Sequence, residues 1–208
     1  MQYTGLMTRY QKVLALALAA VFIWSAVHPQ SQSDWFLENI PILLAVVPLC
    51  LMGRHFKLSN ISYTLIVLYL VLPLIGSHFG VAGVPFGYTL GHIVHSDRNM
   101  YDRLVHFSFG FLWAYPIREI YIKLTQTKGF WSYYVPFDIV LSFSAIYEIF
   151  EWAIGVSVNP ALGADFLGAQ GDFFDTSKDM AVAGTGALAA MIIIYFINRR
   201  SSENSVIK

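Results

Sequence analysis

The sequence has few charged residues, a single cysteine and no excess of either charge. Charged side chains make up 12% of the 208 residues, against roughly a quarter in soluble domains, so the chain cannot form an ordinary water-exposed surface. Its 13 basic and 13 acidic side chains balance, and we expect no nucleic-acid partner. The lone Cys50 excludes a disulfide framework and a thiolate metal site.

Hydrophobic residues are abundant instead. They make up 56% of the chain, and its mean hydropathy is +0.56. Apolar runs that approach the length needed to cross a hydrocarbon core of about 30 Å recur along the sequence, without the alternation typical of a barrel. They predict an all-α integral membrane protein, a single domain over residues 1–200 with about six transmembrane helices. These helices are expected near residues 10–28, 35–52, 60–78, 102–124, 133–154 and 173–198, followed by a disordered cytoplasmic tail at 201–208.

Basic residues predict the orientation of these helices, because they concentrate in the cytoplasmic connections of membrane proteins. They gather in alternate connections of this chain. The clusters are Arg9 and Lys12, then Arg54 and Lys57, then Arg118, Lys123 and Lys128, and finally Arg199 and Arg200. Both ends of the chain are therefore expected in the cytoplasm.

The connections on the opposite side are mostly acidic. Their acidic residues are Asp34, Glu38, Asp97, Asp102, Asp165, Asp172 and Asp175. The two longer connections, residues 80–101 and 155–171, are rich in glycine, proline, asparagine and aspartate. Such residues favour turns, so we expect turns rather than helices in both segments.

Ionisable residues also gather at the predicted extracytoplasmic ends of the last three helices. Membrane helices rarely carry such residues unless they face water or the interior of a bundle. Asp102 and His106 are four residues apart at the start of one helix, so they share a face. Helix capping with local pairing explains Asp102 well and His106 poorly.

Two more acidic sets lie on the neighbouring helices. Glu148 and Glu151 share a face near a helix C-terminus, where the macrodipole disfavours negative charge. Asp172, Asp175 and Asp179 form one stripe at the start of the last helix, and Asp179 lies too deep for an ordinary end effect. The small residues that follow should allow close packing, which would put the stripe inside the bundle. These are Ala181, Ala183, Gly184, Gly186 and Ala187.

Together these side chains predict a site for a divalent cation such as Zn²⁺, Mn²⁺ or Mg²⁺, because carboxylates with an imidazole suit these ions. The candidate metal ligands are Asp102, His106, Glu148, Glu151, Asp175 and Asp179. The candidates for contacting an anion or substrate are Arg103, Lys178, His78 and Asp172. The alternative is a purely structural charge network, in which Arg103 and Lys178 neutralise the acidic side chains.

Three phrases of the sequence resemble the YjdF family of bacterial inner-membrane proteins. They are YDRLVHF from Tyr101, YEIFEW from Tyr147 and GAQGDFFDT from Gly168. The similarity runs from His78 to Ala190 and includes VPFG from Val84 and the dipeptide Arg98-Asn99. It implies a multi-pass protein of the bacterial inner membrane. It implies little about activity, because the biochemical function of that family is undetermined.

A more distant similarity is to VanZ-like membrane proteins, which are associated with glycopeptide-antibiotic resistance. The order of an Asp-basic-x-x-His-Phe helix start, a Glu-containing helix and an acidic segment before a Gly-Ala-rich helix is shared. The matching residues are Asp102, Arg103, His106, Phe107, Glu148, Glu151, Asp175 and Asp179. Gly184 and Trp152 stand where those sequences often have Asn and Gln. The similarity implies a common four-helix core rather than a common substrate.

The sequence leaves three functions open, and whether the chain is an enzyme stays open with them. The first is a cation site that acts through metal-activated water on a lipid-linked or envelope substrate, with Arg103 and Lys178 holding its anionic group. The second is a transporter or an ion- or proton-coupled carrier that uses the same carboxylates as a relay. The third is a non-catalytic structural membrane protein. The cytoplasmic half lacks the polar groups that a carrier needs, which favours the first.

Overall fold

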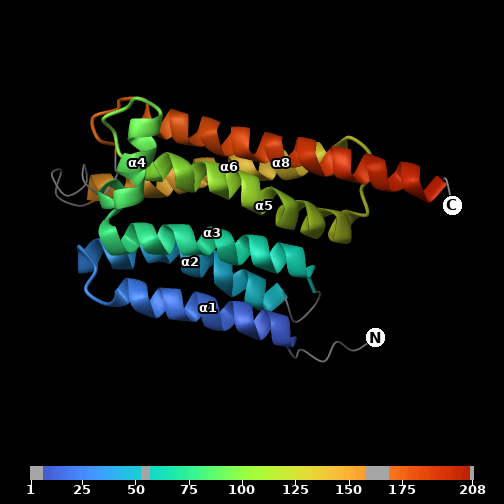
Figure 1. Ribbon diagram of the computed structural model, residues 1–208, viewed down its shortest axis with the longest axis horizontal. Helices are drawn as coiled ribbons and strands as arrows, with labels where there is room; N and C mark the ends of the chain where they lie inside the picture. Colours follow the sequence, from blue (N-terminus) through green and yellow to red (C-terminus); the bar gives the residue numbers. More distant parts are fainter. Residues whose placement is uncertain (1–6, 53–56, 158–168, 207–208) are drawn as a thin grey trace.

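The computed structural model describes residues 7–52, 57–157 and 169–206, and these residues are helical without strands. Six long helices run side by side along one direction (Figure 1). They are α1 (Arg9–Ala26), α2 (Gln32–Met52), α3 (Asn60–Phe79), α5 (Tyr101–Thr125), α6 (Trp131–Ser157) and α8 (Asp175–Val206). A 3₁₀ turn, η1 (Val81–Gly83), and the short helix α4 (Pro85–Ile93) join α3 to α5. The predicted all-α membrane fold class is confirmed.

Helix α4 corrects the expectation of turns over residues 80–101. Pro85 occupies its first turn, where the missing N–H is not needed by the helix. Gly87 and Gly91, which we interpreted as turn signals, are instead the buried packing face of α4. A Cβ on Gly87 would collide with the side chain of Asn99, and one on Gly91 would collide with the carbonyl oxygen of Arg98.

Two other expectations concern the C-terminal end of the chain and the second long connection. Helix α8 continues to Val206, whereas we expected a disordered tail from residue 201. In the second long connection, α6 extends to Ser157, and residues 158–168 with Asp165 lie outside the described residues. Arg54, one of the basic residues that predict the orientation, also lies outside them.

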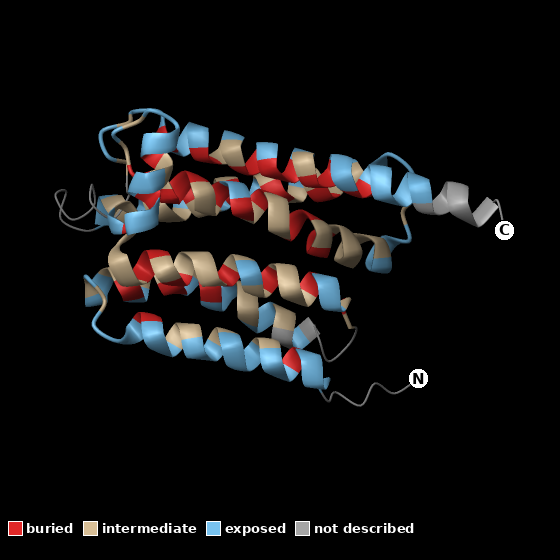
Figure 2. Cartoon of the chain, in the orientation of Figure 1, coloured by how far each residue is buried: buried red, intermediate tan, exposed pale blue. Residues whose placement is uncertain are grey.

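Exposed residues follow the outer surfaces of the helices (Figure 2). Many of them are large and apolar, as expected of a protein whose solvent is lipid. Exposed side chains include Leu16 on α1, Leu44 on α2 and Phe196 on α8. Three helical segments are long and apolar enough to cross a membrane, namely Asn60–Phe79, Trp131–Ser157 and Asp175–Arg200. The total of six spans and the N-in/C-in orientation stay predictions.

The core is most tightly packed where α5 crosses α8, the most extensive helix pair of the bundle. A Cβ on Gly110 would collide with the carbonyl oxygen of Ala183, and one on Gly186 would collide with that of Phe107. The backbones therefore touch, which matches the close packing predicted for the glycine-alanine face of α8. Gly184 faces α6 instead, where an added Cβ would lie 2.8 Å from Leu141 Cδ2.

Candidate functional site

Charged residues form one cluster at the end of the bundle where α5 and α8 begin and α6 ends. We call it the charge cluster. Its members are Arg98, Asp102, Arg103, His106, Glu148, Glu151, Asp172, Asp175, Lys178 and Asp179. The close crossing of α5 and α8 brings the helix starts together, so their acidic and basic side chains meet inside the bundle. The structure thus unites the three polar sets that the sequence placed on separate helices.

Arg103 lies at the centre of the charge cluster with its side chain only 9% exposed. Its guanidinium forms ion pairs with Asp175 and Asp179. Its Nη2 lies 3.3 Å from Asp172 Oδ2. A guanidinium is charged at every physiological pH and, when buried, requires carboxylates around it. The ion pairs expected for Arg103 in the alternative charge network are therefore present.

Arg98 belongs to the cluster, although we did not predict it as a site residue from the sequence. It precedes α5, and its Nη2 lies 2.6 Å from Asp175 Oδ1 and 3.7 Å from Asp102 Oδ2. Its Nη1 donates a 2.6 Å hydrogen bond to the carbonyl oxygen of Ala169, in the segment before α8. The one signal in the sequence was its place in the Arg98-Asn99 dipeptide of the family resemblance. Arg98 and Arg103 together hold the acidic stripe of α8 against α5.

Lys178 and Asp172 form the exposed edge of the charge cluster. The ammonium of Lys178 donates to both carboxylate oxygens of Asp172, at 2.7 and 3.0 Å. This hydrogen bond lowers the pKa of the Asp172 carboxyl below its ordinary value. The Lys178 side chain is 55% exposed, so of these three cations it is the one that faces the surroundings.

His106 lies deeper, among three carboxylates. Its Nε2 lies 3.5 Å from Asp102 Oδ1, 3.5 Å from Glu148 Oε1 and 4.0 Å from Asp179 Oδ1. These distances exceed that of an ordinary N–H···O hydrogen bond. One ligand atom from each of Asp102, His106 and Asp179 lies within 4.8 Å of the others. With metal–ligand bonds of about 2.0–2.2 Å, such a triangle can close around one ion after a small shift.

Glu148 is a buried carboxylate with one oxygen that lacks a donor among the described residues. The residue is 5% exposed, and Thr176 hydrogen-bonds to its side chain. Its Oε1 has no hydrogen-bond donor among the described residues and points toward His106. Burying a carboxylate oxygen without a donor costs on the order of several kcal/mol unless a cation or a proton compensates. Glu148 and the His106 ring therefore mark the part of the cluster that needs a further positive charge.

Glu151 belongs to the charge cluster, whereas His78 lies against another helix. Glu151 lies one turn beyond Glu148 and is half-buried. Its side chain forms a hydrogen bond with Tyr147, and its charge interacts with that of Asp102. The charge of Asp102 also interacts with that of Glu38 on α2. We did not predict Glu38 as a site residue from the sequence. His78 instead packs against α1: its Nδ1 lies 3.2 Å from the carbonyl oxygen of Ser25, and its ring stacks near Trp24. The structure does not bring it to the cluster.

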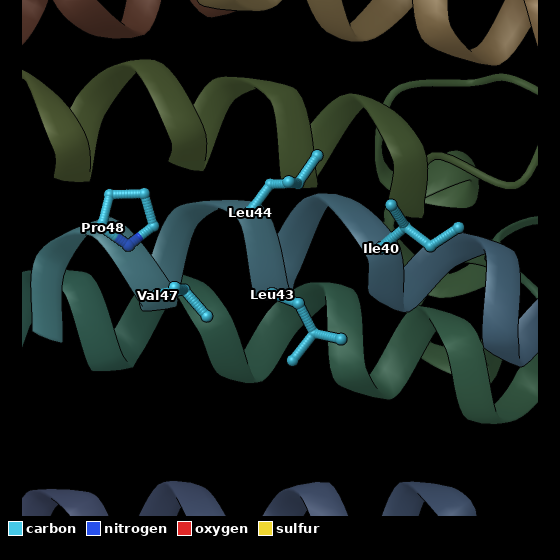
Figure 3. Close-up of a pocket in the computed structure, with 5 residues that line it drawn as sticks. All are labelled: Ile40, Leu43, Leu44, Val47 and Pro48. Carbon is cyan, nitrogen blue, oxygen red and sulfur yellow. The ribbon is translucent and has the colours of Figure 1, made fainter. Parts of the chain in front are cut away.

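A groove on α2 offers no alternative site. It has a volume of about 370 Å³ and lies along α2 (Figure 3). Its lining is Ile40, Leu43, Leu44, Val47 and Pro48, all exposed and all apolar. These side chains carry no group that can bind a charged ligand.

The comparisons with known proteins agree with the membrane fold. The DUF2238 family, described as "Predicted membrane protein", matches residues 10–200. Inner membrane protein YjdF of Escherichia coli (strain K12) is 33% identical over 196 residues, which cover 90% of this chain and 92% of that protein. No solved structure matches significantly. The distant similarity to VanZ-like proteins stays a prediction, whereas the YjdF resemblance is confirmed. The chain belongs to the DUF2238 family of predicted membrane proteins.

Proposed function

We propose that this protein is a bacterial inner-membrane protein that binds one divalent cation beside His106. The ligands in this proposal are Asp102, His106, Glu148 and Asp179, with Glu151 near them. The observation that carries it is the buried Glu148 Oε1, which lacks a hydrogen-bond donor and lies 3.5 Å from His106 Nε2. Three carboxylates and one imidazole are a ligand set for Zn²⁺, Mn²⁺ or Mg²⁺.

The charge balance of the cluster supports a bound cation over a charge network alone. Six carboxylates of the cluster face three permanent cations, Arg98, Arg103 and Lys178, so three negative charges remain before His106 is considered. The ion pairs of Arg98 and Arg103 are with Asp102, Asp172, Asp175 and Asp179, whereas Glu148 Oε1 lies 3.5 Å from His106 Nε2. A divalent cation on the His106 side would neutralise most of the remainder.

The substrate in this proposal is a lipid-linked or envelope molecule with an anionic group such as a phosphate. A bound cation would supply activated water or polarise an oxygen of that group. Arg103 already forms ion pairs with four carboxylates, so the contact with the anion falls to the exposed Lys178. A one-sided site suits the apolar interior beyond the cluster, where Leu74, Val140 and Ala187 are fully buried. A carrier needs polar groups through the bilayer, and this core does not support one.

Metal analysis of the purified protein tests the cation. Protein purified without chelator or polyhistidine tag should hold about one divalent ion per chain, measured by inductively coupled plasma mass spectrometry. Glu148→Gln and Asp102→Asn should each lower that content about tenfold or more, because each removes a charged ligand. Glu119→Gln, at the opposite end of α5, is the matched control and should keep the ion. No metal in the unmutated protein would contradict the proposal.

The same proposal places the charge cluster outside the cytoplasm, following the distribution of basic residues. In a Cys50→Ser background, Phe173→Cys should react with a membrane-impermeant maleimide in intact cells, because Phe173 is 92% exposed beside the cluster. Lys57→Cys should react only after the cells are opened. The reverse pattern would move the site to the cytoplasmic side.

A further inference from the structure

Arg118 lies near the end of α5 farthest from the charge cluster, where the start of α6 and the C-terminal part of α8 also lie (Figure 1). Its side chain is half-buried and faces the start of α6. The guanidinium carbon lies 4.3 Å from the centre of the Tyr133 ring, and Nη2 donates to Ser132 Oγ at 3.4 Å. Two contacts from one helix therefore hold the guanidinium in a defined position.

The guanidinium of Arg118 lacks a counter-charge within the described residues. No carboxylate there lies within 4.0 Å of it, and its buried Nε has no acceptor. The neighbouring Glu119 turns toward α3 and pairs with Lys123. Asp138, five residues after Tyr133, lies on a different side of α6. The two arginines of the charge cluster, by contrast, each form ion pairs with at least three carboxylates. A half-buried guanidinium that has lost part of its hydration is stabilised by an anion in place of the missing carboxylate.

The surroundings of Arg118 are basic. Asn198 of α8 donates to the Tyr133 hydroxyl at 3.1 Å, so this part of α8 adjoins the same ring. The basic residues next to these elements in the chain are Lys128, Arg199 and Arg200, and all three are exposed. Their charge raises the local concentration of anions at this end of the bundle.

Aromatic residues indicate that Arg118 lies at the surface of the bilayer. Phe130, Trp131 and Tyr134, at the start of α6, are all exposed. Helix α6 is long and apolar enough to cross a membrane. Exposed Trp and Tyr at the end of such a helix lie at the level of the lipid headgroups. The phosphates of the lipids therefore lie at the depth of the guanidinium.

We propose that Arg118 binds a phosphate group at this end of the bundle, and that Tyr133 positions the guanidinium for it. A guanidinium lying on a ring keeps the N–H groups at its edge available, and two of them match two oxygens of a phosphate. The phosphodiester of an anionic phospholipid and free phosphate both offer these oxygens. The depth of the site favours the lipid. The site is separate from the charge cluster, so the inference holds whether or not a cation binds there.

Native mass spectrometry of the full chain in detergent tests the lipid as the source. Dioleoylphosphatidylglycerol, which has a net negative charge, is titrated beside dioleoylphosphatidylcholine, whose phosphate is neutralised by its own choline. The unmutated protein should retain phosphatidylglycerol more strongly. Arg118→Gln should weaken that binding about tenfold or more, because charge-assisted hydrogen bonds are lost. Lys128→Gln, the matched control, removes an exposed charge at the same end and should weaken it about fivefold at most.

Inorganic phosphate tests the other source. Isothermal titration calorimetry of the delipidated protein should show no binding of millimolar phosphate if the ligand is a lipid, and binding that Arg118→Gln abolishes if free phosphate is the ligand. Either result that depends on Arg118 supports the site and identifies its source.

The proposal would be overturned if Arg118→Gln retained phosphatidylglycerol as well as the unmutated protein and no phosphate binding depended on Arg118. If Arg118→Gln is not monodisperse in size-exclusion chromatography, Arg118→Lys replaces it, since an ammonium keeps the charge but not the geometry for two oxygens. Arg118→Lys should weaken binding several-fold, and undiminished binding by it would then overturn the proposal.

Discussion

Carboxylates near the two ends of α5 are in opposite states. Near its C-terminus, Glu119 accepts hydrogen bonds from the Ser59 backbone N at 2.8 Å, from Ser59 Oγ at 2.8 Å and from Ser62 Oγ. The ammonium of Lys123 lies 2.7 Å from its Oε1. Both of its oxygens have donors, and together these bonds cap the start of α3 from a neighbouring helix.

At the opposite end, Asp102 begins α5 within a cluster that has more carboxylates than cations, and Glu148 there has an oxygen without a donor. About 25 Å of helix separates Asp102 from Glu119, at 1.5 Å per residue. The protein can therefore provide donors for both oxygens of a carboxylate, as at Glu119, where that carboxylate has a structural role alone. At the other end, positive charges and hydrogen-bond donors are too few for the carboxylates. This shortage distinguishes a candidate site from a structural network.

Removing the central cation of the charge cluster should have the largest effect. Arg103→Met would leave Asp172, Asp175 and Asp179 without their shared guanidinium and should lower the free energy of unfolding by about 3–5 kcal/mol. Thermal unfolding in detergent, followed by the loss of monodisperse protein, measures this. Arg103→Lys should also destabilise, because one ammonium cannot contact three carboxylates in the same geometry. Unchanged stability of Arg103→Met would show that the ion pairs are incidental.

Neutralising Glu119 and Glu148 should have different effects on stability. Glu119→Gln breaks a satisfied set of hydrogen bonds and should destabilise by about 1–3 kcal/mol without changing metal content. Glu148→Gln removes an uncompensated charge, so in chelator-treated protein it should stabilise or leave the melting temperature unchanged. Equal destabilisation by both substitutions would erase the distinction between the two ends.

Smaller effects on stability are expected from the glycines at the contacts of α8 with α5 and α6, because these glycines have different neighbours. Gly110→Ala and Gly186→Ala would press a methyl group against backbone and should each destabilise by about 1–3 kcal/mol. Gly184→Ala meets only the side chain of Leu141, which can change rotamer, so its cost should be lower. Melting temperatures of the three variants give the ranking. A larger loss for Gly184→Ala would mean that α8 packs mainly on α6.

The sequence was sufficient for the membrane fold and for local pairs such as Asp102 and His106, because both depend on hydropathy and helical spacing. It was not sufficient for partners that are distant in the chain. Arg98 lies outside a helix and pairs with Asp175, 77 residues later, so no local spacing shows the contact. His78 was misplaced because the end of a helix does not reveal which neighbour its side chain faces.

Helix α4 shows a second limit of local patterns. Glycines such as Gly87 and Gly91 are typical both of turns and of helix faces that touch another backbone, and only the loop packed against α4 decides between the two. The same limit hid Gly110, a single glycine within an apolar helix, until the close crossing with Ala183 was visible. The tertiary partner, rather than the local sequence, sets the role of a glycine.

The central claim, a cation held by His106, is tested most directly by the magnetic coupling of a bound ion to the imidazole nitrogen. Protein stripped with chelator and reloaded with one equivalent of Mn²⁺ should show nitrogen modulation in electron spin-echo spectra. The modulation should persist in Glu119→Gln and disappear in His106→Gln. Absence of protein-bound Mn²⁺, or nitrogen modulation that survives His106→Gln, would contradict the account.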